Sequence, residues 1–471
     1  MVSFSVLAVI LPLSGALALA GVGGPRFGAF ANITLSALGL VLTLLVWWQA
    51  QVGPLSALFG VLSGFMGVLA ALSNARLVMQ DSGHISPRHW RCAHALFQLF
   101  LSLNLLGLYT DNIGLLWLAL CGEGVAVALE LSLGNSLNAL RAAWVSLLWG
   151  SVGAGLALLG TLLVYLAAQP VLGEGLMAMS FTALSSHAAH FNQSLLILGF
   201  ILILFGYGSK ISLMSFPGGL TQSHAEGAFH LAYVPQALFA NVVLLAILRF
   251  RHLLQGETGT GLAAALMLAF AILSFLHAAF AMPRQDNISR FAGILASLQA
   301  AISLFAFGVG GVMGVFGGLL QMLLQSLLKT GLFLALANLT SGRGTQTSFL
   351  SLRTLAQTNK YNFWAFAVAL LALSGLPPSG LFVSEFIIIR QTILSGPFLC
   401  LPLSIGLGLC ALPVLRRAGG ILFRPVPAEN HVKAGKGFSL AFVPLGLMFV
   451  LAFAMPHFLT RLLIQAAGAL Q

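Results

Sequence analysis

The chain consists of long apolar segments separated by short polar ones. A helix needs about 20 apolar residues to cross the hydrocarbon core of a bilayer, and fourteen segments reach roughly that length. These candidate spans are residues 3–22, 27–49, 54–79, 91–110, 112–131, 142–168, 193–213, 231–250, 261–282, 289–309, 312–340, 361–395, 397–416 and 439–462. The pattern therefore predicts an all-α polytopic membrane protein with about 14 transmembrane helices.

Two of these spans carry residues that break a helix. Pro217, followed by two glycines, comes directly after the seventh span, and Pro377 and Pro378 lie inside the twelfth. Non-helical backbone at membrane depth is tolerated only where it contacts protein or lines a wet cavity. Because the breaks lie five spans apart, we expect an inverted repeat of two five-helix units, with broken helices 7 and 12 beside a transport path.

The amino-acid composition excludes a soluble enzyme. Of the 471 residues, 59% are hydrophobic and only 7% are charged, whereas a soluble protein has about 25% charged residues. The four cysteines show no close pairing of the kind that binds zinc or an iron–sulfur cluster. His84, His89 and His94 flank one loop, the other histidines are scattered, and we interpret all of them as solvated or interfacial. We therefore expect no metal and no cofactor in this chain.

The basic residues give the chain a net charge of +11, and their distribution predicts its orientation. In membrane proteins the cytoplasmic loops hold the excess of Lys and Arg. With the N-terminus outside, 15 of the 21 basic residues fall in inner loops or at their borders, and 4 fall on the outer side. We therefore expect both termini on the outer face, and the positive charge does not indicate binding to nucleic acid.

Few charged residues remain inside the predicted spans, and these are the candidate functional residues. Lys210 closes the seventh span, Lys329 lies deep in the eleventh, and Glu123 lies in the fifth between two glycines. Glu385 follows the break in the twelfth span. A charge in the hydrocarbon core costs roughly 3 kcal/mol or more, so such residues usually face the interior of the bundle and pair with one another.

Each of these residues also has a purely structural interpretation. Lys210 can extend its amine from a helix end to the membrane interface, and Glu123 can form an ion pair that holds two spans together. Glu385 near the start of a half-helix can simply stabilise the helix dipole. Glu130, near the end of the fifth span, is interpreted as a solvated interfacial acid.

Lysines and carboxylates along the membrane midplane can form a proton relay. Buried amines and carboxylates can change charge near neutral pH, and an approaching opposite charge alters how readily they do so. Such coupling lets a distant event move protons along the series. The charges inside the spans therefore favour ion or proton translocation.

Several stretches give the chain a resemblance to a known family. They are Asp111 to Trp117 with Ala142 to Trp144, Gly208 to Lys210 with His224 to Glu226, Asp286 to Arg290, Gln321 to Phe333, and Gly375 to Phe386. In these stretches the chain resembles the antiporter-like membrane subunits shared by respiratory complex I, multi-subunit cation/proton antiporters and membrane-bound hydrogenases. It is most similar to component F of hydrogenase-4 and its formate hydrogenlyase relatives, from about the fourth span to the thirteenth.

The resemblance implies roles for individual residues. Lys210 matches the family's proton-path lysine on its broken seventh helix, Lys329 matches the lysine of the second half, and Glu385 matches the charged residue on the exit-side broken helix. His224 and Glu226, which follow the seventh span, are implied as supporting polar residues.

The sequence departs from the family pattern at part of this path. The family's glutamate on the fifth span falls on Cys121, and Glu123, two residues later, lies about 200° around the helix from it. The family's two histidines before Lys329 fall on Gln321 and Gln325, which can hold water but cannot titrate. We keep Glu123 in the predicted proton path and Gln321 and Gln325 as supporting polar residues.

These observations divide the chain into four predicted parts. Residues 1–110 hold the first four transmembrane helices, and residues 111–250 form a first half-channel that includes the break near Pro217. Residues 251–416 form a second half-channel that includes the other break, and residues 417–471 hold an inner loop and the last transmembrane helix.

The resemblance implies a proton-translocating or proton-conducting membrane subunit of a hydrogenase-4-like or complex I-like oxidoreductase, with no redox centre of its own. It implies other membrane subunits as neighbours in the bilayer, hydrophilic redox subunits on the cytoplasmic side, and a location in the inner (cytoplasmic) membrane of a bacterium or archaeon. Two alternatives remain. One is a proton channel or antiporter subunit of a non-redox ion or inorganic-carbon transport complex. The other is a scaffold subunit whose proton path has decayed, which Cys121, Gln321 and Gln325 favour.

Overall fold

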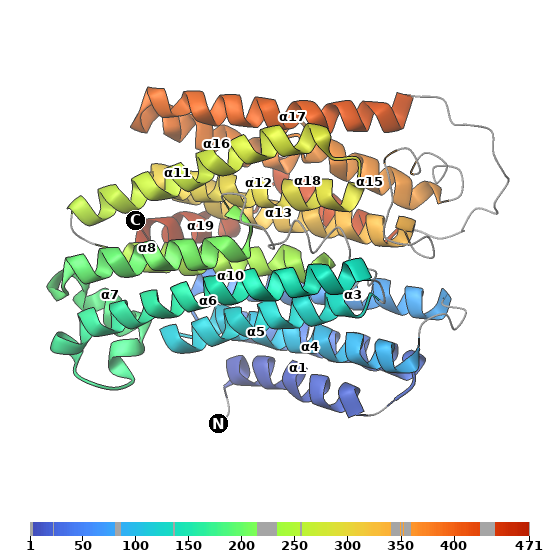
Figure 1. Ribbon diagram of the computed structural model, residues 1–471, viewed down its shortest axis with the longest axis horizontal. Helices are drawn as coiled ribbons and strands as arrows, with labels where there is room; N and C mark the ends of the chain where they lie inside the picture. Colours follow the sequence, from blue (N-terminus) through green and yellow to red (C-terminus); the bar gives the residue numbers. More distant parts are fainter. Residues whose placement is uncertain are drawn as a thin grey trace.

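The computed structural model describes residues 3–21, 23–80, 86–134, 137–213, 233–254, 257–340, 349, 352, 359–423 and 439–470. Throughout these residues the regular structure is helical, and one isolated bridge pairs Asn112 with Ser180. The helices run side by side along the long axis of the molecule (Figure 1). The predicted all-α architecture is therefore confirmed for the part of the chain that the structure describes.

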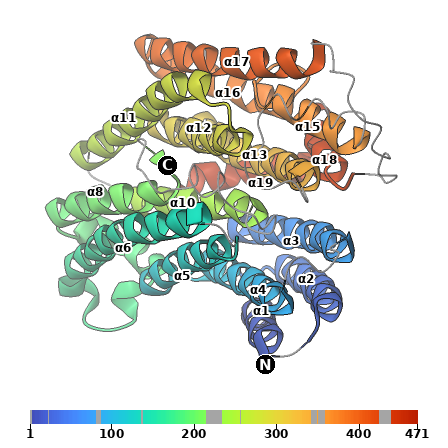
Figure 2. The same cartoon turned by 45° about the vertical axis from the view of Figure 1, so that its right-hand side comes forward.

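The N-terminal helices form one side of the bundle (Figure 2). They are α1 (Phe4–Gly21), α2 (Pro25–Trp48), α3 (Pro54–Gln80) and α4 (Pro87–Tyr109). Proline at the first position of α2 and of α4 suits a helix start, because its missing N–H would have no partner there. The hydroxyl of Ser86 accepts a hydrogen bond from the His89 amide and caps α4.

The next group of helices surrounds the first candidate lysine. It consists of α5 (Ile113–Ser132), α6 (Leu137–Leu172), α8 (Gln193–Lys210) and α10 (Tyr233–His252), with η1 (Met177–Met179), α7 (Phe181–His187) and η2 (Ala188–His190) between α6 and α8. Helices α6 and α8 approach closely, since a β-carbon on Gly206 would lie 2.5 Å from the Ala157 amide nitrogen. This contact fixes α8, and with it Lys210, against α6.

The second half of the chain holds the most deeply buried helices. It consists of α11 (Glu257–Ala281), η5 (Met282–Arg284), α12 (Ile288–Val309), α13 (Gly311–Thr340), α15 (Lys360–Ala372), α16 (Gly380–Ser395), η6 (Pro397–Leu399), α17 (Cys400–Phe423), α18 (Phe442–Phe453) and α19 (His457–Ala469). The most apolar window of α12 is 94% buried and that of α13 is 83% buried, against 28% for α6 and for α17. Helices α12 and α13 therefore form the centre of the bundle, and α6 and α17 lie at its surface.

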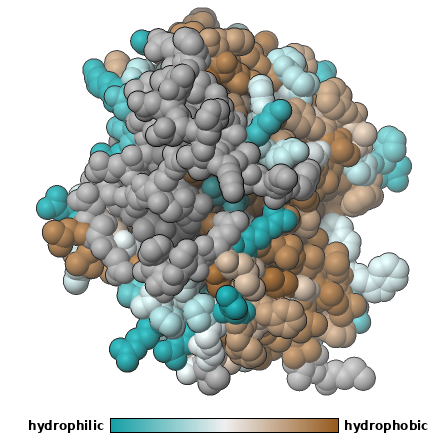
Figure 3. Space-filling model, turned by 90° about the vertical axis from the view of Figure 1, so that its right-hand side faces the viewer, coloured by the Kyte–Doolittle hydropathy of each residue, from teal (hydrophilic) through white to brown (hydrophobic). Residues whose placement is uncertain are grey.

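Eleven of the described helices are long and apolar enough to cross a membrane, and the bent pair α18–α19 can add a twelfth. The predicted eighth and twelfth spans correspond to α10 and to the α15–α16 pair. Large apolar side chains such as Trp48 and Phe398 are more than 80% exposed, and apolar side chains extend over much of the described surface in Figure 3. The chain is therefore a multi-pass membrane protein, while the total of 14 spans and the inverted repeat stay predictions.

The predicted last span, 439–462, is wrong as a single helix. Helix α18 ends at Phe453, α19 begins at His457, and the two are bent by 81°. Pro456 lies at the start of α19, where its ring suits a helix beginning and cannot continue the preceding helix.

The first and last described residues lie at the same end of the bundle. The Ser5 amide donates to Gln51 Oε1 over 2.9 Å, and Leu470 borders the same cavity as Gln51 and Thr182. The marked C-terminus lies toward the same end of the molecule as α7 in Figure 1. This arrangement agrees with an even number of membrane crossings, and the outward orientation of this end stays a prediction.

The break predicted in the twelfth span is present. Helix α15 ends at Ala372, and α16 begins at Gly380, with Pro377 and Pro378 between them joined by a cis peptide bond. The hydroxyl of Ser379 accepts a hydrogen bond from the Phe382 amide and caps α16. The break predicted at Pro217 lies outside the described residues.

Candidate functional site

Lys210, the last residue of α8, is buried against the inner face of α5. Its side chain is 8% exposed, and a β-carbon on Gly124 would lie 3.6 Å from Lys210 Nζ. Gly124 is near the middle of the 20-residue helix α5. The amine therefore lies at mid-membrane depth, and extension to the interface does not account for it.

Glu123 contributes a buried carboxylate beside this lysine. Its side chain is fully buried and neither carboxylate oxygen has a hydrogen-bond partner among the described residues. It lies next to Asn104 of α4 and interacts electrostatically with Lys210. Cys121 occupies the position of the family's glutamate, but Glu123, two residues later, still places an acid near Lys210.

Glu130 is a second buried acid on α5, and its interpretation as a solvated interfacial residue is wrong. It is 1% exposed, and both of its oxygens are without a partner in the described part of the chain. It lies seven residues after Glu123, which is nearly two helical turns, so the two carboxylates share one face of α5. The position near a helix end hid this burial from sequence analysis.

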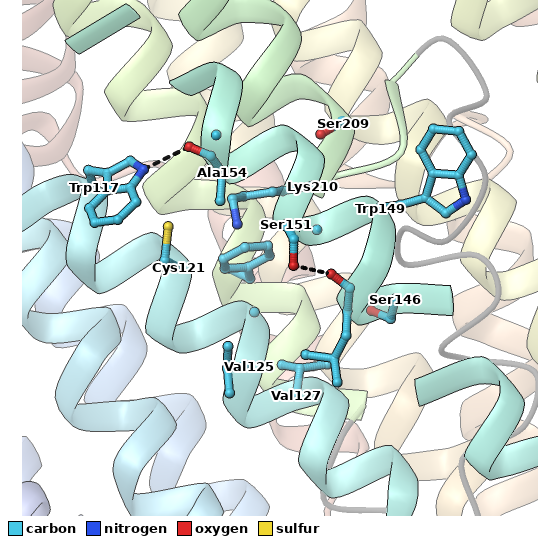
Figure 4. A pocket seen from close by; sticks show the side chains of 15 residues that line it. Trp117, Cys121, Val125, Val127, Ser146, Trp149, Ser151, Ala154, Ser209 and Lys210 are labelled. Carbon is cyan, nitrogen blue, oxygen red and sulfur yellow. Dashed lines mark hydrogen bonds between the residues drawn. The ribbon is translucent and has the colours of Figure 1, made fainter. Parts of the chain in front are cut away.

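A cavity of about 350 Å³ adjoins the Lys210 amine. Trp117, Cys121 and Val125 of α5 line it, together with residues of α6 and with Ser209. In Figure 4 the Lys210 amine lies between the Cys121 thiol and the Ser151 hydroxyl.

Lys329 lies at the centre of the second half. It is 2% exposed, and its Nζ donates to the Ala296 carbonyl of α12 over 2.9 Å and to Gln325 Oε1 over 3.1 Å. Gln321, Gln325 and Lys329 are spaced by four residues along α13, so they share one face of that helix. Gln325 therefore contacts the lysine directly.

Gln321 connects this face of α13 to the helix that carries Glu385. Its Nε2 donates to Gln299 Oε1 of α12, and its Oε1 accepts from the Ser384 hydroxyl of α16. Glu385, next to Ser384, is 8% exposed. Because Glu385 is the sixth residue of α16, it lies beyond the first turn, where the helix dipole has its effect.

Asn241 and Ser326 form a polar bridge between the two halves that sequence analysis missed. Asn241 Nδ2 donates to Ser326 Oγ over 2.8 Å, and both residues are buried. Helix α10 carries Asn241 and packs against both α8 and α13. A single asparagine within an apolar span is the one signal for it in the sequence, and that signal does not identify the partner.

His94 is also buried, which corrects its interpretation as a solvated or interfacial histidine. It is fully buried between α2, α3 and α4, and its Nδ1 accepts from Asn32 Nδ2 over 3.1 Å and from Asn74 Nδ2 over 3.2 Å. Gln98 Nε2 donates to the Asn32 side chain in the same cluster. This cluster joins three N-terminal helices through polar contacts.

The structure does not describe the other residues that the sequence predicts for the site. His224 and Glu226 lie outside the described residues, as does Pro217. No group of three or more His, Cys, Asp or Glu side chains among the described residues is arranged to hold a metal ion.

Gly375 is required by the geometry around Glu385. Its φ is +70°, which residues with a side chain rarely adopt, and a β-carbon there would collide with Glu385 Oε2. We expect Gly375→Ala to destabilise the protein by about 1–3 kcal/mol and to displace the Glu385 carboxylate. Thermal unfolding of the purified protein measures the first effect, and the proton flux that the family resemblance implies measures the second.

Gly408→Ala is the matched control, because a β-carbon at Gly408 meets open space. This control should leave both the unfolding temperature and the flux nearly unchanged. If Gly375→Ala behaved like the control, the tight packing of Gly375 against Glu385 would be refuted.

The chain is a polytopic membrane protein whose long apolar helices enclose two lysines and three carboxylates. Charged residues in the interior of a membrane bundle are typical of ion-translocating proteins. Residues 110–409 match the family described as "NADH:quinone oxidoreductase/Mrp antiporter, TM". The chain belongs to this family.

Relatives agree with this assignment along most of the chain. The chain is 34% identical over 408 residues to the hydrogenase-4 component F homolog of Methylacidiphilum infernorum, an alignment that covers 85% of this chain and 86% of the relative. A chain of the membrane-bound sulfane sulfur reductase, an archaeal respiratory membrane complex, matches with a TM-score of 0.83 at 17% identity and covers 100% of this chain and 98% of that one. A chain of respiratory complex I from Thermus thermophilus matches with a TM-score of 0.80 at 21% identity, covering 99% of this chain and 100% of that one. These two structures share the fold.

Proposed function

We propose that this chain is a proton-translocating membrane subunit of a hydrogenase-4-like or complex I-like oxidoreductase complex. The observation that carries the proposal is a series of buried polar groups that extends from α5 to α16. It consists of Glu130, Glu123, Lys210, Asn241, Ser326, Lys329, Gln325, Gln321, Ser384 and Glu385. Such groups are costly inside a membrane and persist where they serve an ion path.

In the first half, protons pass between the α5 carboxylates and Lys210. Glu130 lies nearer the end of α5 and Glu123 nearer the lysine, so together they lead from that end of the helix toward mid-membrane. Lys210 alternates between its charged and neutral forms, with water in the adjoining cavity completing the contacts. Cys121 borders that cavity without carrying the charge of a carboxylate.

In the second half, protons pass between Lys329 and Glu385. Gln325 and Gln321 lie between them on the same face of α13, and Gln321 contacts Ser384 directly. Since glutamine cannot titrate, it holds and orients water along this section. The Asn241–Ser326 bridge lies at the junction of the two sections.

Partners follow from the surface and from the relatives. The outer helices expose apolar side chains, and the matching structures belong to multi-subunit membrane complexes, so other membrane subunits lie beside this chain. Hydrophilic redox subunits bind on the cytoplasmic side and carry the electron transfer. The complex is located in the inner membrane of a bacterium or archaeon.

A scaffold with a decayed path is the second candidate, and Cys121, Gln321 and Gln325 favour it. An antiporter subunit without redox partners is the third, because the matching family includes Mrp antiporters. The scaffold predicts redox partners without proton flux through this chain, and the antiporter predicts cation/proton exchange without redox partners.

Purification of the complex through a tag on this chain tests the proposal. We expect membrane subunits and redox subunits to co-purify in a mild detergent, and liposomes containing the complex to change their internal pH when an electron donor and acceptor are added. An active cation/proton exchanger without redox subunits would refute the proposal, and a redox complex without any pH change would favour the scaffold.

A further inference from the structure

A slot between α5 and α6 borders Lys210, and Figure 4 shows side chains that line it. On α5 its lining extends from Trp117 to Val127, which corresponds to about 15 Å of helix. Val125 is 47% exposed and Trp149 of α6 is 41% exposed, and both border the slot. The slot therefore opens on the face of the bundle that contacts lipid.

A hydrogen bond joins the two helices of the slot, and small residues shape one of its walls. Trp117 Nε1 donates to the Ala154 carbonyl over 2.9 Å, which joins α5 to α6 at one end of the slot. On α6, Gly150 and Gly155 line the slot, and a β-carbon on either would meet open space. The missing side chains leave room for a narrow, extended group between the helices.

The inner wall of the slot carries the amine of Lys210, and the acid that interacts with this amine, Glu123, does not line the slot. Lys210 is more than nine-tenths buried and its side chain borders the slot, and within the described residues no hydrogen bond or ion pair joins its Nζ to another side chain. None of the residues that line the slot is acidic. Glu123 is fully buried, lies beside Asn104 of α4 and interacts electrostatically with Lys210, but it is not among the residues that line the slot.

We propose that this slot binds an amphiphilic carboxylate, such as a long-chain fatty acid, from the membrane. The carboxylate lies against Lys210 Nζ as a charge-assisted pair, and the alkyl chain lies along the apolar wall between Trp117 and Gly155. Binding pockets for such ligands are mostly apolar with a few polar groups that fix orientation. A ligand dissolved in the bilayer reaches the opening without crossing water.

Binding has a consequence that rests on the proposed function. A carboxylate paired with Lys210 holds the amine in its charged form, so occupancy of the slot inhibits proton movement. The binding itself does not depend on that function and is measured separately.

Photo-crosslinking of the assembled complex in lipid nanodiscs tests the binding. The probe is a diazirine-bearing dodecanoic acid, and mass spectrometry identifies the modified peptides. We expect modification of residues 117–127 and 146–155, with competition by dodecanoic acid and none by dodecanol. Lys210→Met should lower this labelling by about tenfold or more, the ratio expected for loss of one buried contact to a charged group. Gly150→Leu should lower it comparably, because the leucine side chain fills the open space that Gly150 leaves in the slot.

Two control variants separate specific binding from general effects. Lys360→Met removes an exposed lysine at the start of α15, outside the proton path, and Val152→Leu changes an exposed residue of α6 that does not line the slot. Both should keep full labelling. Equal competition by dodecanol, labelling retained in Lys210→Met, or no labelling of the slot because a neighbouring subunit fills it would each overturn the proposal.

Discussion

Lys210→Met is expected to abolish proton movement through this subunit while leaving the complex assembled. Methionine keeps much of the volume of lysine and removes the titrating amine from mid-membrane, where Lys210 is 8% exposed. Loss of an acid–base group typically lowers a rate by about a hundredfold or more. The pH inside proteoliposomes during electron transfer, at matched amounts of assembled complex, measures the effect.

Lys210→Arg separates the need for a charge from the need for titration. Guanidinium stays charged and does not release its proton, so this variant should also fail to move protons. Lys360→Met, which changes an exposed lysine at the start of α15, is the matched control and should retain full flux. Undiminished flux in Lys210→Met would contradict the proposed path, and normal flux in Lys210→Arg would show that a fixed charge is sufficient.

Lys329 should be equally important in the second half. Lys329→Met removes the amine and leaves Gln325 Oε1 without its donor, which costs about 1–3 kcal/mol when such a group stays buried. We therefore expect loss of proton flux together with a lower unfolding temperature.

Lys329→Gln distinguishes the two effects. Its amide can still donate to Gln325 Oε1 but cannot titrate, so it should recover part of the stability and none of the flux. Thermal unfolding and proteoliposome pH measurements on both variants give the comparison. Flux restored by glutamine would show that Lys329 has a structural role only.

Hydropathy was a strong predictor of the fold because the bilayer sets the length of every spanning helix. Each predicted span from the first to the thirteenth corresponds to a described helix or helix pair, and the break between α15 and α16 follows from Pro377 and Pro378. The bend between α18 and α19 was missed, because one proline at position 456 was not enough to divide an otherwise continuous apolar segment.

The candidate site was less accessible from the sequence, because a buried polar residue does not reveal its partner. The buried positions of Lys210 and Lys329 followed from their place inside apolar spans, since a charge there must face protein. The contacts of Gln321 with Gln299 and Ser384, on two other helices, depend on packing that no local pattern records.

The burial of three other polar residues was also not predicted from the sequence. Glu130 lies close to the end of α5, where solvent exposure is the usual expectation, and it is 1% exposed because neighbouring helices cover it. The partners of Asn241 and of His94 lie on other helices, and only the three-dimensional arrangement brings these residues next to Ser326 and to Asn32.

The central claim is that protons driven by electron transfer cross the membrane through this chain. The ratio of protons translocated to electrons transferred, recorded simultaneously in proteoliposomes with wild-type and Lys210→Met complexes, tests it most directly. Our account predicts a lower ratio in the variant, because the remaining subunits cannot replace this path. An unchanged ratio at matched assembly would contradict the account and identify the chain as a scaffold.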